Sequence, residues 1–438
     1  MSSETATGAS SSRWGALSYP NYRRYWFAAI VRVFGIQFRF IGAGWLVAVE
    51  LDQSPFWLGM VWLATALPTI LLSVPAGSFA DRTEPYRLLV GSQLLSFLGH
   101  FVLAVLIVTG AVTLWMVIVW ALATGSFAAF AAPSMSAILP RLIERRAMSS
   151  AVALNSGVWG AMRIVGPAAS GVLIALVGTG QAFFVAAVTT ALSVVVLLTI
   201  RLPARTSELA SADQSGMMVG LRFIWSRPIF FVIIGLSFFT SVFGSSYVVL
   251  LPIFAEDLLE VGSTGFGIME ASAGVGALLG TYAVLRYGIG SRPGLVMFGF
   301  ASIFGVLIAI FATTDSLAPA SAMLLLGGFA EEIFLVIGMT VLQLAVPDQL
   351  RGRVMGIWTM TYFLASIGGF IAGIAAEIVG VRIAIAAGAL TVTAFAPVVY
   401  FVASELRTLR GDAIVEETLG LEDGDAAERA PGEPVAAG

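Results

Sequence analysis

Six charged side chains in the interior of long apolar stretches of this sequence are candidates for a functional site. Charge is costly in an apolar medium, so an ionisable residue there suggests a substrate, ion or proton site. Arg32 and Arg39 are about two helical turns apart and project from one helical face. The other four residues are Arg163, Glu270, Glu331 and Glu332.

The carboxyl groups among them are candidates for carrying a coupling proton. Desolvation favours the neutral form of a carboxyl group, whereas a nearby arginine favours the charged form. Adjacent residues on a helix point about 100° apart, so Glu331 and Glu332 are not expected to face the same place. The alternative is a structural ion pair between two helices, and the residues leave both interpretations open. Arg163 is expected to hold neighbouring helix ends, and His100 is expected to be a packing residue.

Twelve apolar stretches must position these residues. The chain has 438 residues, of which 58% are hydrophobic and 11% are charged, whereas soluble proteins carry about 25% charged residues. A bilayer core needs about 20 apolar residues per helix, and short charged loops separate stretches of that length. The sequence therefore predicts an all-α membrane protein with twelve transmembrane helices, at 22–50, 56–79, 87–109, 113–138, 152–177, 180–200, 229–254, 264–286, 294–313, 318–345, 354–379 and 383–404.

Arginine is distributed unequally between the two predicted sides of the membrane. Of the 23 basic residues, 19 fall on the side of both termini, three lie within helices and only Arg382 falls on the opposite side. Cytoplasmic loops are enriched in basic residues, so both termini are predicted to be cytoplasmic. The opposite loops carry acidic residues, namely Glu50, Asp52, Glu256, Asp257, Glu260 and Asp315.

Three polar segments flank or divide the apolar stretches. Residues 1–20 and the acidic segment 405–438 are predicted to be disordered cytoplasmic ends. Residues 201–227 are predicted to form a cytoplasmic linker that includes an amphipathic helix at the membrane surface. The linker separates two halves of six helices, 21–200 and 228–404, whose sequences are weakly similar to each other. Such paired halves are typical of transporters that open to each side of the membrane in turn.

The loop after the second predicted helix carries a recognisable motif. It reads GSFADRTEPYR and places Gly77, Asp81, Arg82 and Arg87 in a turn between two apolar stretches. With the twelve predicted helices, this loop resembles that of the major facilitator superfamily. The segments RIVGPAASG, LRGRVMG and GLRFIWSRP are most similar to the branch of that superfamily that contains bacterial siderophore and macrolide exporters.

The resemblance implies a major facilitator fold with a cytoplasmic gate at this loop. Gly77 would allow two helices to approach closely, and Asp81 would accept hydrogen bonds from the N-terminus of a facing helix that begins near Arg353. Arg82 would bridge neighbouring carboxylates. Residues 84–86 depart from the family pattern. The gate prediction therefore depends mainly on Gly77, Asp81 and Arg82. The alternative is an ordinary polar turn whose charged side chains face water.

The fifth predicted helix contains Gly166, Pro167 and Gly171, which resemble the spaced glycines and the Gly-Pro bend of antiporters in the superfamily. The match is partial, because Ala153, Met162 and Ser170 stand where that pattern has glycine. The alternative is a tightly packed helix with no bearing on transport direction. The resemblance also implies that helices 1, 4, 7 and 10 line a central cavity. The two arginines of the first helix are therefore expected to meet the carboxylates of the tenth helix there.

Several functions are made improbable by residues that the sequence lacks. It has no cysteine and one histidine, and no glycine-rich ATP-binding loop is present. We therefore expect no catalytic residues, no metal, no cofactor and no nucleic-acid partner. The sequence and the resemblance together indicate a monomeric, proton-coupled exporter of a small amphipathic molecule, of the drug or siderophore class, in the bacterial cytoplasmic membrane. The alternatives are an uptake symporter, a lipid flippase, or a non-transporting scaffold that recruits a partner through its acidic tail.

Overall fold

The protein is helical throughout the part of the chain that the structure describes. The computed structural model describes residues 15–200, 216–288 and 290–402, and no strand occurs in these ranges. Twelve helical spans within them are long and apolar enough to cross a membrane, which confirms the predicted number of spans. The two predicted tails, apart from a few residues, and most of the predicted linker lie outside the described residues.

The first half contains six spans, and proline begins three of them. Proline suits the first helical position because the N–H that it lacks would have no partner there. The helix in the fourth span continues through Pro133 and Pro140 and ends four residues later than expected, at Leu142. The helices are α1 (Pro20–Trp45) with the π-helical η2 (Leu46–Glu50), α2 (Pro55–Arg82), α3 (Pro85–Val108), α4 (Leu114–Leu142), α5 (Met148–Val177) and α6 (Thr179–Leu198).

The second half repeats this arrangement, with two of its spans divided into shorter helices. Span 7 consists of several consecutive pieces, and span 11 changes helix at Leu364 instead of running unbroken as predicted. The helices are α8 (Pro228–Phe239), η4 (Thr240–Gly244), α9 (Tyr247–Ile253) and η5 (Phe254–Leu258) in span 7, then α10 (Gly262–Tyr287), α11 (Pro293–Phe311), α12 (Leu317–Ala345), α13 (Asp348–Phe363) with α14 (Ala365–Val379) in span 11, and α15 (Val381–Val402).

The linker contains the predicted amphipathic helix, α7 (Gly216–Ser226). Trp225 on this helix is 72% exposed, whereas its neighbour Ile224 is only 3% exposed. The start of α13 packs against α7, because Gly220 leaves room for the side chain of Arg353. The linker helix is therefore attached to the beginning of span 11.

The internal repeat is clearest at the ends of spans 1 and 7. Both spans finish in a π-helical turn, η2 and η5, and an acidic residue in the left-handed region follows each turn at the same spacing, Asp52 (φ 47°) and Glu260 (φ 53°). The hydrogen bonds that close the two turns also correspond, being Leu51 N to Leu46 O and Gln53 N to Val47 O in one, and Leu259 N to Phe254 O and Val261 N to Ala255 O in the other. The predicted six-plus-six architecture is thus confirmed in the backbone.

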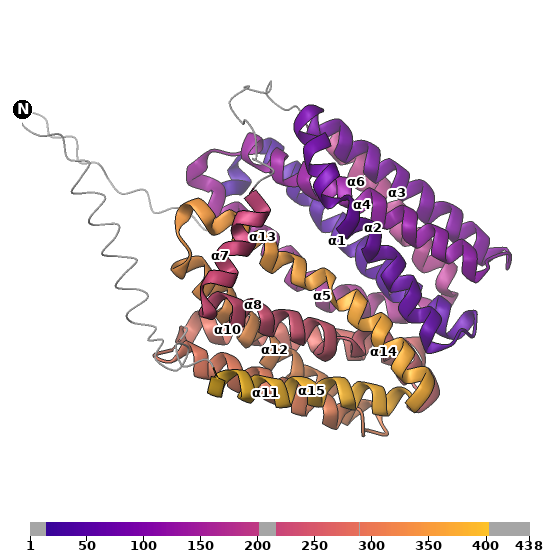
Figure 1. Ribbon diagram of the computed structural model, residues 1–438. Helices are drawn as coiled ribbons and strands as arrows, with labels where there is room; N and C mark the ends of the chain where they lie inside the picture. The colour runs from indigo at the N-terminus through magenta and orange to yellow at the C-terminus, as the bar shows by residue number, and fades with distance from the viewer. Residues whose placement is uncertain (1–14, 201–215, 289, 403–438) are drawn as a thin grey trace, which may run out of the picture.

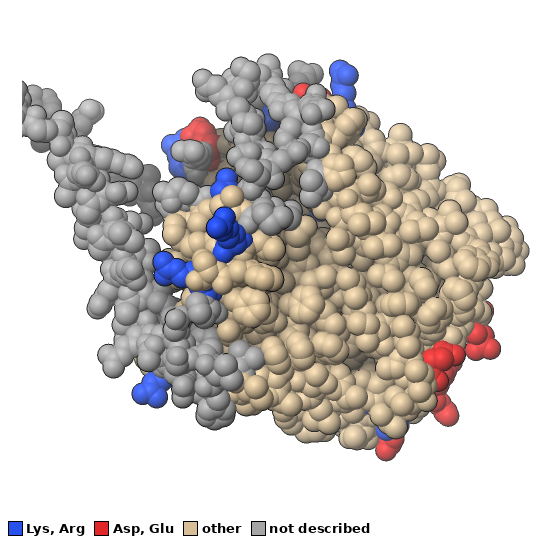
Figure 2. All heavy atoms as spheres, viewed as in Figure 1, with Lys and Arg blue, Asp and Glu red and all other residues tan. Residues whose placement is uncertain are grey.

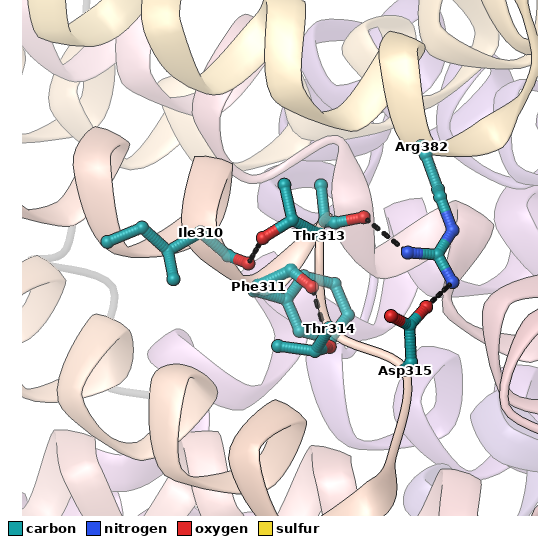
Figure 3. A network of polar contacts seen from close by, with 7 residues as sticks. Ile310, Phe311, Thr313, Thr314, Asp315 and Arg382 are labelled. Atoms are coloured by element: carbon teal, nitrogen blue, oxygen red, sulfur yellow. Dashed lines mark hydrogen bonds and ion pairs between the residues drawn. The ribbon is translucent and has the colours of Figure 1, made fainter.

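Charged side chains concentrate at opposite ends of the helical bundle, as Figure 2 shows. We call the end formed by the loops 51–54, 259–261 and 312–316 the acidic end, and the opposite end, with loops 83–84 and 143–147, the arginine end. The one arginine of the acidic end, Arg382 of α15, is bound there in a local network (Figure 3). It donates to the Asp315 carboxylate and to the Ala312 carbonyl oxygen of the loop between α11 and α12.

The two halves meet along two pairs of helices. Helix α5 of the first half packs against α10 of the second, and α14 of the second half packs against α2 of the first. In Figure 1, α5 and α14 accordingly lie along the boundary between the indigo-to-magenta and pink-to-yellow helices. This boundary crosses the middle of the bundle, so residues on α5 and α10 are placed to interact between halves.

Candidate functional site

Arg163, near the middle of α5, interacts with carboxyl groups of the second half. Its Nη1 lies 3.8 Å from Oε2 of Glu332 on α12. It also interacts electrostatically with Glu331 of α12 and with Glu270 of α10. We call these four residues the inter-half cluster. The sequence favoured a structural role for Arg163 at neighbouring helix ends, and the structure shows that it interacts with all three predicted acidic site residues.

The adjacent carboxylates of α12 diverge as helical geometry requires. Glu331 Oε1 accepts a hydrogen bond of 2.7 Å from the Ser245 hydroxyl, which follows the π-helical turn η4 of span 7. Glu332 Oε1 accepts one of 3.2 Å from the Thr281 hydroxyl of α10. One acid therefore connects α12 to span 7, and the other connects it to α10 and α5.

Glu270 reaches the cluster because α10 crosses α5 closely. A Cβ on Gly274, one turn further along α10, would lie only 2.7 Å from the Arg163 carbonyl oxygen. The absence of a side chain there allows the two backbones to approach. The Oε1 atom of Glu270 is buried and has no hydrogen-bond partner in the described part of the chain. A buried carboxylate without a partner is unfavourable, so this atom needs a proton or a cation.

The structure does not bring Arg32 and Arg39 to the acids of α12. The Arg39 guanidinium lies over the ring of Trp120 on α4, 5.9 Å from its centroid, and His100 contacts the same ring edge-on. Arg32 lines a cavity inside the first half together with Tyr25. The expected meeting fails because the first helix presents this face to α3, α4 and α6 and not to the second half.

The loop predicted to form a gate lies at the arginine end. Helix α2 ends at Arg82, and the Thr83 hydroxyl donates to the Phe79 carbonyl oxygen at 2.7 Å, which terminates the helix. The side chains of Asp81 and Arg82 lie outside the part that the structure describes, and Arg87 is exposed. A gate at these residues remains a prediction.

The described contacts around this loop differ from those expected of the gate. No described atom lies within 4 Å of the position that a Cβ on Gly77 would take, so no close approach of another helix to this glycine occurs among the described residues. Arg353, the expected start of the facing helix, packs instead against Gly220 of α7. Glu84, which departs from the family pattern, forms an ion pair of 2.8 Å with Arg141 of α4.

At the acidic end, glycines bring α5 and α10 into backbone contact. A Cβ on Gly267 would lie 2.5 Å from the Pro167 carbonyl oxygen and 3.1 Å from Gly171 Cα. The Ser263 hydroxyl donates to the Gly171 carbonyl oxygen at 3.0 Å. Two of the three residues predicted to bend α5 therefore lie at the crossing with the other half. The third, Gly166, packs against the side chain of Gln37 on α1.

The other pair of helices, α2 and α14, crosses in the corresponding way. A Cβ on Gly373 would lie 2.5 Å from the Pro55 carbonyl oxygen and 3.5 Å from Gly59 Cα. A Cβ on Gly59 would in turn lie 2.9 Å from the Gly369 carbonyl oxygen. The two glycine crossings match residue for residue through the internal repeat, and both close the acidic end.

Glycines nearer the arginine end are not packed in this way. No described atom lies within 4 Å of a Cβ placed on Gly157 of α5 or on Gly352 or Gly356 of α13. The backbone contacts between the halves at glycines therefore lie at the acidic end and, at Gly274, in the middle of the bundle, whereas these three glycines nearer the arginine end have no described neighbour at that distance. The Arg163–Glu332 pair is not fully enclosed by protein, since 48% and 23% of the two side chains are exposed.

Sequence reasoning missed the polar residues that hold the cluster and its helix. These are Ser245 and Thr281, which bind the carboxylates, and Gln37, whose amide donates to the Met162 carbonyl oxygen at 3.3 Å in the turn before Pro167. In the sequence, each of them appears only as a single polar residue within an apolar span. Many serines and threonines that bond only to their own helix appear in the same way, so this pattern does not distinguish the two groups.

Comparison with known proteins agrees with this architecture. The family described as transmembrane secretion effectors matches residues 11–418 of the chain. The staphyloferrin A transporter of Staphylococcus aureus is 25% identical over 377 residues, covering 84% of this chain and 92% of that protein. The multidrug efflux pump Tap of Mycolicibacterium fortuitum is 28% identical over 371 residues, covering 81% and 89%. The enterobactin exporter EntS of Shigella boydii is 22% identical over 348 residues, covering 78% and 82%.

Solved structures show the same fold. A bacterial homologue of the human lysosomal transporter Spinster, inward-facing and unoccupied, superposes with a TM-score of 0.69 at 14% identity, covering 88% of this chain and 98% of that one. The nucleoside transporter NupG gives a TM-score of 0.66 at 14% identity, covering 88% and 99%. These neighbours and the relatives are transporters and not enzymes. The chain therefore belongs to the transmembrane secretion effector family of the major facilitator superfamily and is a multi-pass membrane transporter.

Proposed function

We propose that this transporter exports a small amphipathic molecule from the cytoplasm in exchange for protons. The observation that carries the proposal is the inter-half cluster, in which Arg163 of one half faces Glu270, Glu331 and Glu332 of the other. One guanidinium balances one carboxylate, so the remaining carboxyl groups need protons or a bound cation within the membrane. Carboxyl groups that release protons when another partner binds would couple transport to the proton gradient.

The present conformation supports the loading step of such a cycle. The glycine crossings join the two halves at the acidic end, whereas Gly157, Gly352 and Gly356, nearer the end that the positive-inside rule assigns to the cytoplasm, have no described neighbour within 4 Å of an added Cβ. Substrate enters from this side and reaches the cluster. Separation of the two glycine crossings and closure near Gly77 then expose the cluster to the opposite side, where substrate leaves and protons bind. Both termini are cytoplasmic in this scheme, and a monomer in the bacterial cytoplasmic membrane is sufficient.

The printed names of the relatives support export and the substrate class. They are a siderophore transporter, a multidrug efflux pump and a siderophore exporter, each matched over most of its length. We therefore assign the substrate to the drug or siderophore class of small amphipathic molecules.

Reconstitution tests the proposal directly. Purified protein in liposomes should move a fluorescent amphipathic probe, such as ethidium, only when a pH gradient is imposed. Replacing Glu270, Glu331 and Glu332 together by Gln should abolish the probe movement that the pH gradient drives. Glu377→Gln is the matched control, because Glu377 is exposed on α14 and lies outside the cluster. Gradient-driven transport that survives in the triple variant would contradict proton coupling at these carboxyl groups.

A further inference from the structure

A cavity inside the first half presents hydrogen-bond donors and no acidic group. It lies between α1, α3, α4 and α6, and its polar lining consists of Arg32 and Tyr25 of α1 and Ser193 of α6. Apolar side chains, including Leu89 and Met135, form the rest of the wall. The cavity is separate from the inter-half cluster, which is formed by α5, α10 and α12.

Arg32 lacks a counter-charge within the described part of the chain. It forms neither an ion pair nor a hydrogen bond there, and the three carboxyl groups at membrane depth interact with Arg163. Its Cα lies about 18 Å along α1 from Pro20, well within the span. A guanidinium at this depth is strongly unfavourable unless an anion or other electron-rich group accompanies it.

The charge of Arg39, two turns further along the same helix, is stabilised differently. Its guanidinium lies over the Trp120 ring, and the electron-rich face of indole stabilises a cation. Trp120 belongs to α4, and no aromatic ring takes that position over Arg32 among the described contacts. The two arginines therefore provide a matched pair, one with a cation–π partner and one without.

Ser193 is the second unusual group of the cavity wall. The hydroxyls of the preceding turn of α6 donate to carbonyl oxygens of their own helix, as Thr189 does to Val185 at 2.8 Å and Thr190 does to Ala186 at 2.7 Å. The Ser193 hydroxyl is buried, with the residue 1% exposed, and has no protein partner in the described chain. A buried hydroxyl without a partner is unfavourable, so it is available to a ligand in the cavity.

We propose that this cavity binds a small inorganic anion of the size of chloride, held by the Arg32 guanidinium and the hydroxyls of Ser193 and Tyr25. A wall that offers donors and a positive charge but no carboxylate selects a negatively charged acceptor. A water molecule would satisfy Ser193 but would leave the charge of Arg32 without compensation. The apolar remainder of the wall excludes a strongly hydrated or multiply charged ion.

Anion-dependent stability tests the site. The purified protein in a non-ionic detergent is heated at constant ionic strength while chloride replaces gluconate. The melting temperature of the unmodified protein should rise with chloride and reach a plateau. Arg32→Gln should lose this response, and Ser193→Ala should weaken the apparent chloride affinity several-fold. Arg39→Gln should keep the response, because Arg39 lies outside the cavity lining.

A second measurement locates the anion and protects the test against a misfolded variant. Crystals grown with bromide in place of chloride should show anomalous scattering within hydrogen-bond distance of the Arg32 guanidinium. Arg32→Lys keeps the charge and should keep a chloride response at altered affinity. The proposal is overturned if the unmodified protein shows no saturable response, if Arg32→Gln responds equally, or if only an anionic phospholipid such as phosphatidylglycerol raises the melting temperature.

Discussion

Substitution of Gly267 by alanine should shift the protein away from the conformation closed at the acidic end. The new Cβ would lie 2.5 Å from the Pro167 carbonyl oxygen, whereas ordinary contact begins at 3.4 Å, so α5 and α10 must separate by the difference. Both opposing atoms belong to backbone and cannot rotate away. Overpacking of this kind is unfavourable by about 1–3 kcal/mol, which corresponds to about 5- to 150-fold in a conformational equilibrium.

Spin labels measure this shift without prior engineering, because the chain contains no cysteine. Cysteines at Thr109 and Ser316, exposed at the acidic end of each half, report the distance between the halves there. Double electron–electron resonance should show a larger population of long distances in Gly267→Ala than in the otherwise unmodified protein. Gly373→Ala, at the corresponding crossing of α2 and α14, should shift the population in the same direction.

The control for this experiment is Gly157→Ala on α5, where no described atom lies within 4 Å of the added Cβ. This variant should give the same distance distribution as the unmodified protein. The reasoning is refuted if Gly267→Ala leaves the distribution unchanged, or if Gly157→Ala shifts it as much. In either case the glycine crossings would not determine which end is open.

Three further predictions test other regions. Asp81→Asn should weaken closure at the arginine end and increase labelling of a cysteine introduced in span 11 by a reagent added from that side; unaltered labelling would remove the gate assignment. Arg382→Gln should lower the free energy of unfolding by less than about 1 kcal/mol, because its partner Asp315 is 82% exposed. A larger decrease, measured by chemical denaturation, would show that the network of Figure 3 stabilises the fold more than an exposed ion pair does. Deletion of residues 411–438 should leave transport in liposomes unchanged, whereas a loss of transport would assign the acidic tail a direct role.

Glu331 and Glu332 of α12 illustrate what helical geometry can predict from the sequence and what it cannot. Neighbouring residues on any α-helix diverge by about 100°, so different partners for Glu331 and Glu332 could be predicted without a structure. The identity of those partners, Ser245 and Thr281, could not, because it depends on which helices lie beside α12. The same limit explains Arg32 and Arg39, whose common helical face was predictable but whose direction towards α3, α4 and α6 was not.

The glycines show the corresponding limit for packing. Gly166, Pro167 and Gly171 were identifiable from their spacing in one helix, but Gly267 carried no signal that distinguished it from the many other glycines. A glycine matters when another backbone approaches it, and that approach is a property of two helices together. The linker helix α7 shows the same effect, since its amphipathic pattern was readable and its contact with α13 was not.

The sequence alone determined that this chain spans a membrane twelve times, because helix length and apolar composition are set by the thickness of the bilayer and are written locally in each stretch. The unequal distribution of arginine and the loop at Gly77–Arg87 are also local, and they led to the correct superfamily. Only the tertiary structure decided that Arg163 interacts with Glu270, Glu331 and Glu332, and that close glycine crossings join the halves at the acidic end. Both depend on the relative placement of two halves that are joined by a linker and are far apart in sequence, so no local pattern could specify them.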